Sequence, residues 1–192
     1  MPRLFTALEV PRSVATSLSL LKGGLPGARW IDVENYHVTL RFIGDIDGRN
    51  ADDLADALDQ IEAPPLTLSI RSLSVFGSKK PHALIANIEP QPALAALHFD
   101  IERLCQRLGL AADPRRFIPH ITLARLKNTT PEEAALYLSQ RGLITVPNFT
   151  PGRFVLMSSR DSVGGGPYAI EATYRLIEPP FSGFAENPAT GL

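Results

Sequence analysis

One stretch of the sequence decides how the chain folds: Asn35-Tyr36-His37-Val38-Thr39-Leu40-Arg41-Phe42-Ile43-Gly44. Polar and apolar residues alternate along it, which is typical of a β-strand with one face on a core. Successive side chains of a strand point to opposite faces, so His37 and Thr39 share one face, which Arg41 continues. The apolar residues take the other face, and alternation therefore predicts that Phe42 packs in the core.

A second stretch repeats this pattern, with its histidine 83 positions after the first: Phe117-Ile118-Pro119-His120-Ile121-Thr122-Leu123-Ala124-Arg125-Leu126. Alternation groups His120 with Thr122 on one face and directs Arg125 to the opposite face. The chain has only four histidines, and two of them stand in His-x-Thr-Leu motifs. This coincidence indicates a functional pair rather than two unrelated structural histidines.

The segments around the two motifs also repeat in order, as strand, helix, strand, helix, strand. The first strands of the two halves, near residues 4 and 83, have about the same offset as the histidines, which indicates an internal duplication. The predicted strands cover 4–10, 36–43, 66–76, 83–89, 120–126, 145–158 and 168–177, and the predicted helices cover 11–22, 50–61, 92–108 and 131–141. We therefore expect one domain over residues 1–178, built from repeats 3–80 and 82–177, and a loose tail over 179–192.

Composition narrows the class of protein. The 192 residues are 44% hydrophobic, which is enough for a sizeable core. The formal net charge is −1, which argues against a protein that coats long nucleic acid but allows a pocket for a single phosphate. Cys105 is the only cysteine, so no internal disulfide is possible. The N-terminus lacks a signal-peptide profile and no stretch reaches membrane-spanning length, so we expect a cytoplasmic protein without membrane association. A monomer is the default expectation, since the sequence does not reveal an oligomeric state.

Two histidines with two threonines suit the hydrolysis of a phosphodiester. This reaction takes a proton from the attacking water and gives one to the leaving oxygen, and two histidines can do both near neutral pH. Threonine hydroxyls can bind the phosphate oxygens, and an arginine can neutralise their charge. If the duplicated halves pack about a pseudo-twofold axis, the two polar faces meet in one cleft. The scheme needs neither metal nor cofactor; Asp45 or Glu34 could complete a metal site, but such residues near strand ends are usually solvated.

The two motifs resemble those of the two-histidine phosphoesterase superfamily, and most closely the bacterial and archaeal RNA 2′,3′-cyclic phosphodiesterases, also named 2′-5′ RNA ligases. The resemblance extends from Leu4 to about Ile177. It implies a bilobal α+β fold in which two antiparallel sheets face a central cleft and helices cover the outer faces. It also implies hydrolysis of a terminal ribose 2′,3′-cyclic phosphate, on RNA ends or small nucleotides, to a 2′-phosphomonoester.

The resemblance assigns roles to residues by their place in the motifs. His37 corresponds to the proton donor for the leaving 3′ oxygen, and His120 to the base that activates water. Thr39 and Thr122 resemble the hydroxyls that bind the phosphate. Arg125 resembles the cation that neutralises it, and this role requires a β-bulge or a side chain that reaches around the strand end.

Two further residues are candidates for substrate binding. Arg41 would lie on the polar face of the first motif. Tyr168 follows a glycine-rich segment at the start of a strand, where cleft lining, with stacking on a base, and plain packing are equally good interpretations.

The sequence leaves several alternatives open. The same groups run in reverse would join RNA halves through a reversible 2′-5′ ligation, and reversing the roles of His37 and His120 fits the pseudo-symmetric motifs equally well. A noncatalytic nucleotide-binding module is a third possibility, against which the presence of both histidines and both threonines argues. A fourth is that the duplication is purely architectural.

Overall fold

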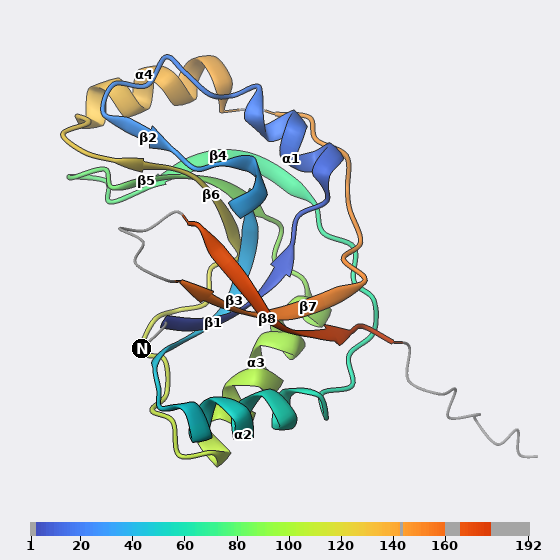
Figure 1. The fold of residues 1–192 in the computed structure, drawn as a ribbon. Helices are drawn as coiled ribbons and strands as arrows, with labels where there is room; N and C mark the ends of the chain where they lie inside the picture. The colour runs from blue at the N-terminus through green and yellow to red at the C-terminus, as the bar shows by residue number, and fades with distance from the viewer. Residues whose placement is uncertain (1–2, 143, 160–165, 178–192) are drawn as a thin grey trace, which may run out of the picture.

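A computed structural model describes residues 3–142, 144–159 and 166–177 of the chain. The tail expected over 179–192 lies outside these residues. The elements follow one another as β1 (Arg3–Glu9), α1 (Arg12–Ser19), β2 (Ala28–Trp30), the 3₁₀ turn η1 (Val33–Asn35), β3 (His37–Asp45), α2 (Gly48–Leu58), β4 (Ile70–Phe76), β5 (Ala83–Ile88), α3 (Pro92–Arg107), β6 (His120–Leu126), α4 (Pro131–Arg141), β7 (Arg153–Ser159) and β8 (Tyr168–Arg175) (Figure 1).

The described strands form one antiparallel sheet whose order mirrors the duplication. The order is β4-β5-β6-β3-β1-β7-β8, and β2 pairs with β6. By their order in the two halves, β1 corresponds to β5, β3 to β6 and β4 to β7. When each strand is replaced by its counterpart, the order from β4 to β7 becomes the same order read in reverse. At the centre, β3 and β6 are joined through the pair Val38 and Ile121. The predicted α+β fold with a duplicated unit is therefore confirmed, and the two sheets that the resemblance implies are two halves of one sheet, joined through this pair.

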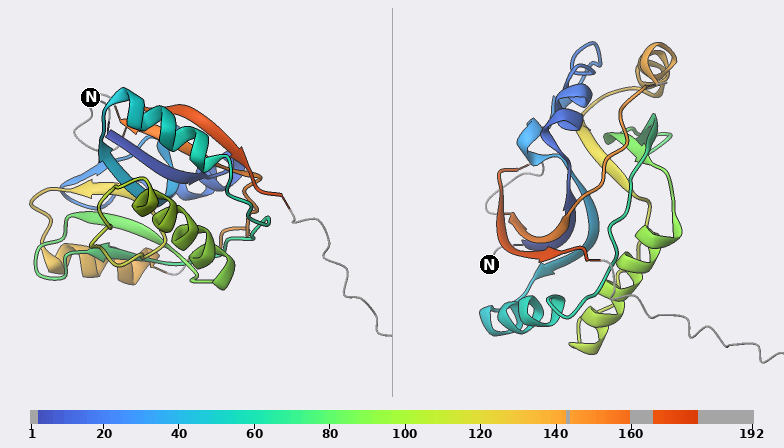
Figure 2. Two further views of the ribbon diagram at one scale, coloured as in Figure 1. Left: turned by 90° about the horizontal axis from the view of Figure 1, so that it is seen from below. Right: turned by 90° about the vertical axis from the view of Figure 1, so that its right-hand side faces the viewer.

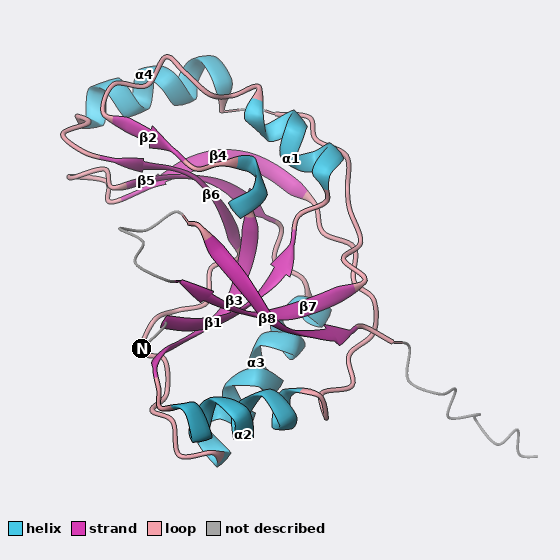
Figure 3. Cartoon of the chain, viewed as in Figure 1, coloured by secondary structure: helices cyan, strands magenta, loops and turns pink. Residues whose placement is uncertain are grey.

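Helices cover the outer surfaces of both halves of the sheet. α2 and α3 lie beside β1 and β3, whereas α1 and α4 lie at the opposite end of the molecule, near β2 and β4 (Figures 1 and 3). The side view shows the curved strands between these helical ends (Figure 2). Each end of the molecule therefore combines segments from the two halves of the sequence. α1, for example, follows β1 in the chain but lies at the end that contains β2, β4 and α4 (Figure 1).

The helix boundaries follow from local sequence. α4 begins with a capping box, in which Thr130 accepts from the Glu133 N–H and the Glu133 carboxylate accepts from the Thr130 N–H. Pro131 occupies its first turn, where the missing N–H has no helical partner to lose. Asp47 caps α2 in a similar way by accepting from the Asn50 N–H. No helix in the described part of the chain is long and apolar enough to cross a membrane.

Two of the predicted strands, 66–76 and 145–158, are shorter in the structure because their first residues are not part of a strand. Residues 66–69 and 145–152 are joined by an isolated bridge, in which Leu68 and Phe149 exchange backbone hydrogen bonds of 2.7 and 3.0 Å, and by a hydrogen bond of 2.9 Å between the hydroxyls of Thr67 and Thr150. The flanking prolines, Pro147 and Pro151, carry no N–H and cannot donate to a ladder. The alternation of apolar residues in these segments instead buries Leu68 and Phe149 against the core.

Candidate active site

The two His-x-Thr motifs meet where the halves of the sheet join. Val38 and Ile121 face each other across β3 and β6, and both side chains are fully buried. The residues on either side of them must then point to the opposite face of the sheet. That face opens into a pocket of about 730 Å³, and the four side chains that flank the pair all line it: His37, Thr39, His120 and Thr122.

Both histidines are held by the same kind of hydrogen bond. The Nδ1 atom of His37 lies 2.8 Å from the carbonyl oxygen of Asn35, and that of His120 lies 2.6 Å from the carbonyl oxygen of Ile118. A carbonyl oxygen only accepts, so each Nδ1 carries the proton and donates it. The Nε2 atom of each neutral ring is therefore the one that can accept a proton from a reactant.

Aromatic rings fix the orientation of the two imidazoles. The ring of His37 lies 5.0 Å from that of Phe5 and 5.2 Å from that of Tyr168, the latter at 89°. The ring of His120 lies 4.9 Å from that of Phe76, also at 89°. Tyr168 lines the pocket, and its backbone N–H donates to the side-chain oxygen of Asn35 at 3.4 Å. Of the two interpretations of Tyr168, the geometry favours cleft lining.

Burial disfavours the protonated form of both imidazoles in the free protein. It lowers the pKa of His37 to about 4; the hydrogen bond to Asn35 opposes this shift, and the charges of His120 and Arg125 add to it. Burial also lowers the pKa of His120, against the hydrogen bond to Ile118 and with a contribution from Arg125. A cation at Arg125 thus acts on both rings, and a bound anion between them would favour their protonation.

A β-bulge at the same place in each motif breaks the alternation that the sequence predicts. Opposite β1, the partners of Thr6 and Ala7 are Arg41 and Thr39, so Leu40 is an extra residue in β3. Opposite β5, the partners of Leu84 and Ile85 are Ala124 and Thr122, so Leu123 is the extra residue in β6. Such an insertion reverses the faces of the residues directly after it.

The bulges decide where the next side chains point. Arg125 is exposed and lines the pocket with the histidines, as its expected role requires. Phe42, which stands 83 positions earlier, occupies the equivalent place. Its side chain is 45% exposed and lines the same pocket, so the prediction that Phe42 packs in the core is wrong.

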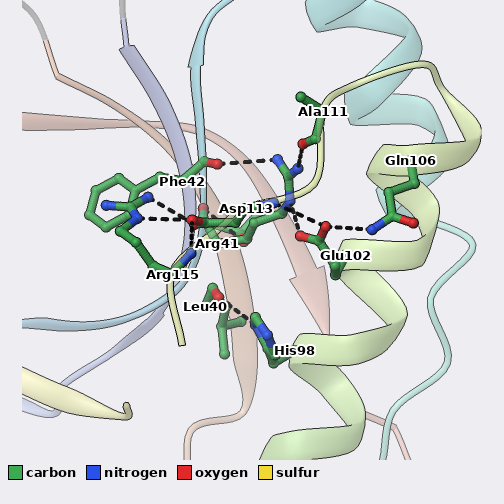
Figure 4. Close-up of polar contacts among 10 residues, drawn as sticks. Leu40, Arg41, Phe42, His98, Glu102, Gln106, Ala111, Asp113 and Arg115 are labelled. Carbon is green, nitrogen blue, oxygen red and sulfur yellow. Dashed lines mark hydrogen bonds and ion pairs between the residues drawn. The ribbon is translucent and has the colours of Figure 1, made fainter. Parts of the chain in front are cut away.

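The same bulge turns Arg41 away from the polar face of β3. Its side chain is 2% exposed, and its Nε donates to Glu102 on α3 at 2.5 Å (Figure 4). The expectation that Arg41 continues the face of His37 and Thr39 as a substrate-binding cation is therefore corrected. Arg41 is among the residues that border the pocket, but its guanidinium is occupied inside the protein.

Sequence reasoning missed several residues that line the pocket. Arg115 and Arg116 come from the segment before β6, Arg3 from the start of β1, and His82 from the turn before β5. With His98, all four histidines of the chain border the pocket. Among the described residues that line it, arginines outnumber the single carboxylate, Asp113. The Arg115-Arg116 pair directly before the second motif was the available signal for this local positive charge.

Comparison with known proteins identifies the family. The sequence profile of the LigT-like phosphoesterases matches the chain twice, over residues 8–86 and 85–168. Proteins named RNA 2′,3′-cyclic phosphodiesterase are similar in sequence. The one from Geobacillus stearothermophilus is 31% identical over 128 residues, which is 63% of this chain but only 41% of that protein. The one from Archaeoglobus fulgidus is 26% identical over 136 residues, 69% of this chain and 77% of that protein.

Solved structures share the fold. TT0787 of Thermus thermophilus superposes with a TM-score of 0.74 at 22% identity, over 91% of this chain and 97% of that one. LigT of E. coli complexed with 3′-AMP superposes with a TM-score of 0.73 at 21% identity, over 93% of this chain and 100% of that one. The doubled profile match covers most of the sequence, and both copies contain one of the two histidines that line the pocket. The chain therefore belongs to the LigT-like phosphoesterase family.

Proposed function

We propose that this protein hydrolyses ribose 2′,3′-cyclic phosphates, on RNA ends or small nucleotides, to 2′-phosphomonoesters. The observation that carries the proposal is the pocket in which two imidazoles, each with Nδ1 tied to a carbonyl, stand with two threonines and Arg125. The names of the sequence relatives, RNA 2′,3′-cyclic phosphodiesterases, agree with it.

Each group has a defined task in the proposed reaction. Nε2 of His120 takes a proton from a water molecule as the water oxygen bonds to phosphorus. The bond between phosphorus and the 3′ oxygen breaks, and Nε2 of His37 gives its proton to that oxygen, which leaves a 3′-hydroxyl and a 2′-phosphate. After the reaction His120 carries an additional proton and His37 has lost one. Proton exchange with solvent returns both histidines to their starting states.

The hydroxyls and the arginine act on the charge at phosphorus. Thr39 and Thr122 donate hydrogen bonds to the non-bridging oxygens, whose charge grows in the transition state. Arg125 faces the same pocket and neutralises that charge. The donor histidine is neutral in the free protein because burial lowers the pKa of His37 to about 4. The anionic substrate must therefore raise this pKa for His37 to hold the proton that it donates.

The test is a hydrolysis assay in EDTA, with a 2′,3′-cyclic nucleotide and an oligonucleotide that ends in a cyclic phosphate. We expect a 2′-phosphate product from wild type and its loss in the His37→Ala and His120→Ala variants. A 3′-phosphate product, or full activity of either variant, would contradict the mechanism. Activity that appears only after a metal ion is added would contradict its metal-independence.

A further inference from the structure

The two strands that carry the histidine motifs separate directly beyond the pair Val38 and Ile121. Continuation of this antiparallel register would place Thr39 opposite His120, and residues 40–42 opposite 117–119. In the described part of the chain, however, Val38 and Ile121 are the one pair that joins β3 to β6. The distance between Thr39 and the second motif must therefore be set by contacts other than the ladder.

His98 of helix α3 contacts both of the separating segments. Its Nδ1 atom lies 2.8 Å from the carbonyl oxygen of Leu40, the bulge residue of the first motif (Figure 4). Because a carbonyl oxygen only accepts, Nδ1 is the donor. The same imidazole stacks on Phe117, with 4.0 Å between the ring centroids and 4° between the planes. One side chain thus joins the bulge next to Thr39 to the segment that leads to His120.

The equivalent bulge in the second motif is held by the backbone instead. The N–H of Ile31, directly after β2, donates to the carbonyl oxygen of Leu123 at 2.9 Å. The residue 83 positions after Ile31, which would hold Leu40 by the same relation, is Pro114. Proline has no N–H to donate. The first motif therefore lacks this backbone donor, and the imidazole of His98 supplies a donor in its place.

The Leu40 carbonyl is important for the site because the bulge separates two registers of β3. Before the bulge, Thr39 pairs with Ala7; after it, Arg41 pairs with Thr6. A shift of the bulge by one residue would turn the adjacent side chain to the other face of the sheet. Thr39 lines the pocket directly before the bulge, so its hydroxyl is the group that such a shift would displace first.

We infer that His98 is a positioning residue: by holding the Leu40 carbonyl and stacking on Phe117, it places the Thr39 hydroxyl relative to the second motif. This role in catalysis rests on the proposed function, in which Thr39 donates to a non-bridging phosphate oxygen. Charge on that oxygen grows in the transition state, so displacement of the hydroxyl affects kcat more than KM.

The experiment separates the hydrogen bond of His98 from its ring. His98→Phe keeps a ring on Phe117 but removes the donor. His98→Asn removes the ring but keeps a donor, because the asparagine amide nitrogen is attached to Cγ as Nδ1 is. His98→Phe is also combined with Thr39→Val and with Thr122→Val, each of which removes the hydroxyl of one motif. The control is Arg103→Ala, at an exposed position of α3 outside the pocket. The readouts are kcat and KM for adenosine 2′,3′-cyclic phosphate.

We expect His98→Phe to lower kcat about tenfold with little change in KM, since small displacements of active-site groups are costly. His98→Asn should recover most of this loss, and Arg103→Ala should behave as wild type. In the Thr39→Val background, His98→Phe should lower kcat less than about twofold, because the hydroxyl that His98 positions is gone. In the Thr122→Val background the loss should remain about tenfold.

The two threonine backgrounds distinguish positioning from a general loosening of the fold. Loosening would give the same factor in both, and that result would overturn the positioning role. Wild-type kcat in His98→Phe, or an equal loss in His98→Asn, would also overturn it. Thermal unfolding shows whether each variant is folded. If His98→Phe is not, the smaller His98→Leu, which also lacks the donor, takes its place in both backgrounds.

Failure of the proposed function is a separate outcome. If wild type hydrolyses no cyclic phosphate, calorimetric Kd values for inorganic phosphate replace kcat in the same variants, since the threonine hydroxyls can still bind phosphate oxygens. A Kd raised about threefold or more in His98→Phe, but unchanged by it in the Thr39→Val background, would then support the positioning role. An equal change in both threonine backgrounds, or no binding of phosphate by wild type, would overturn it.

Discussion

Val38 and Ile121 pair across β3 and β6 at the point where the two halves of the sheet meet. They are 83 positions apart, as His37 and His120 are, so each occupies the same place in its half of the chain. The pseudo-twofold axis that relates the two halves therefore passes between Val38 and Ile121. Because both side chains are fully buried on one face, the polar neighbours of both are directed together onto the other. The joint between the halves and the candidate active site are thus one structural feature.

Replacing either histidine by asparagine should abolish most of the activity and leave the fold intact. The asparagine amide can keep a hydrogen bond to the carbonyl of Asn35 or Ile118 but cannot exchange protons near neutral pH. We expect His37→Asn and His120→Asn to lower kcat/KM by about 10²- to 10⁴-fold. Thermal unfolding of both variants is the control, because it shows whether the fold is intact. A double variant with a much larger loss than either single one would contradict a concerted pair.

The pH dependence should differ between free enzyme and complex. One histidine must be protonated and the other neutral, so both kcat/KM and kcat should follow bell-shaped profiles. Both pKa values are lowered in the free protein, that of His37 to about 4, which places the optimum of kcat/KM below pH 6.5. The bound phosphate raises them, so the optimum of kcat should lie at higher pH. Rate profiles over roughly pH 4 to 9 test this, and coincident optima would argue against it.

Burial of His37 should also make the fold sensitive to acid. The folded pKa of about 4 lies below the ordinary value of 6.5, so the unfolded chain binds more protons between these values. The stabilisation is complete above pH 6.5 and is lost as the pH falls through about 4. Between about pH 7.5 and 4.5, wild type should lose about 2.5 kcal/mol of unfolding free energy more than His37→Asn does. Denaturant titrations at both pH values measure this difference; parallel losses would mean that His37 is not buried as described.

Arg125 and Arg41 should behave in opposite ways when changed. Arg125 is exposed in the pocket, so Arg125→Met should lower kcat/KM about 10²-fold or more with little change in stability. Arg41 is 2% exposed, and Arg41→Ala leaves the mostly buried Glu102 without its partner. We expect this variant to lose about 3 to 5 kcal/mol of unfolding free energy. Kinetics and urea titrations of both variants separate the two roles, and a stable Arg41→Ala variant would refute the buried ion pair.

Gly166 should be intolerant of a side chain because of Asn35. Its φ of +97° is one that residues with a Cβ rarely adopt, and a Cβ there would collide with the Asn35 side chain. Asn35 holds His37 through its carbonyl and Tyr168 through its amide oxygen. We expect Gly166→Ala to lower kcat/KM by about tenfold or more, since small displacements of catalytic groups are costly. Gly48→Ala, where a Cβ meets open space, is the matched control, and equal activity of the two variants would show that Asn35 does not depend on this close approach.

Much of the fold was readable because it depends on local pattern. The alternation in the two motifs, the helix starts at Pro92 and Pro131 and the repeated order of elements all follow from short-range sequence, and the α+β fold with a duplicated unit is confirmed. The incorrect predictions concern residues whose pairing or orientation depends on contacts with distant segments of the chain. The Leu68–Phe149 bridge replaced two strand ends, and the bulge at Leu40 overturned the faces assigned to Arg41 and Phe42.

The sequence by itself determined the two histidine motifs, their equal spacing within a duplicated chain and the family to which the chain belongs. Only the tertiary structure decided that Arg125 and Phe42 face the pocket while Arg41 is bound inside by Glu102. The physical reason is that a β-bulge is a matter of register between strands. Its position depends on which residues of β1, β5 and α3 stand opposite Leu40 and Leu123, and no pattern within either motif contains that information.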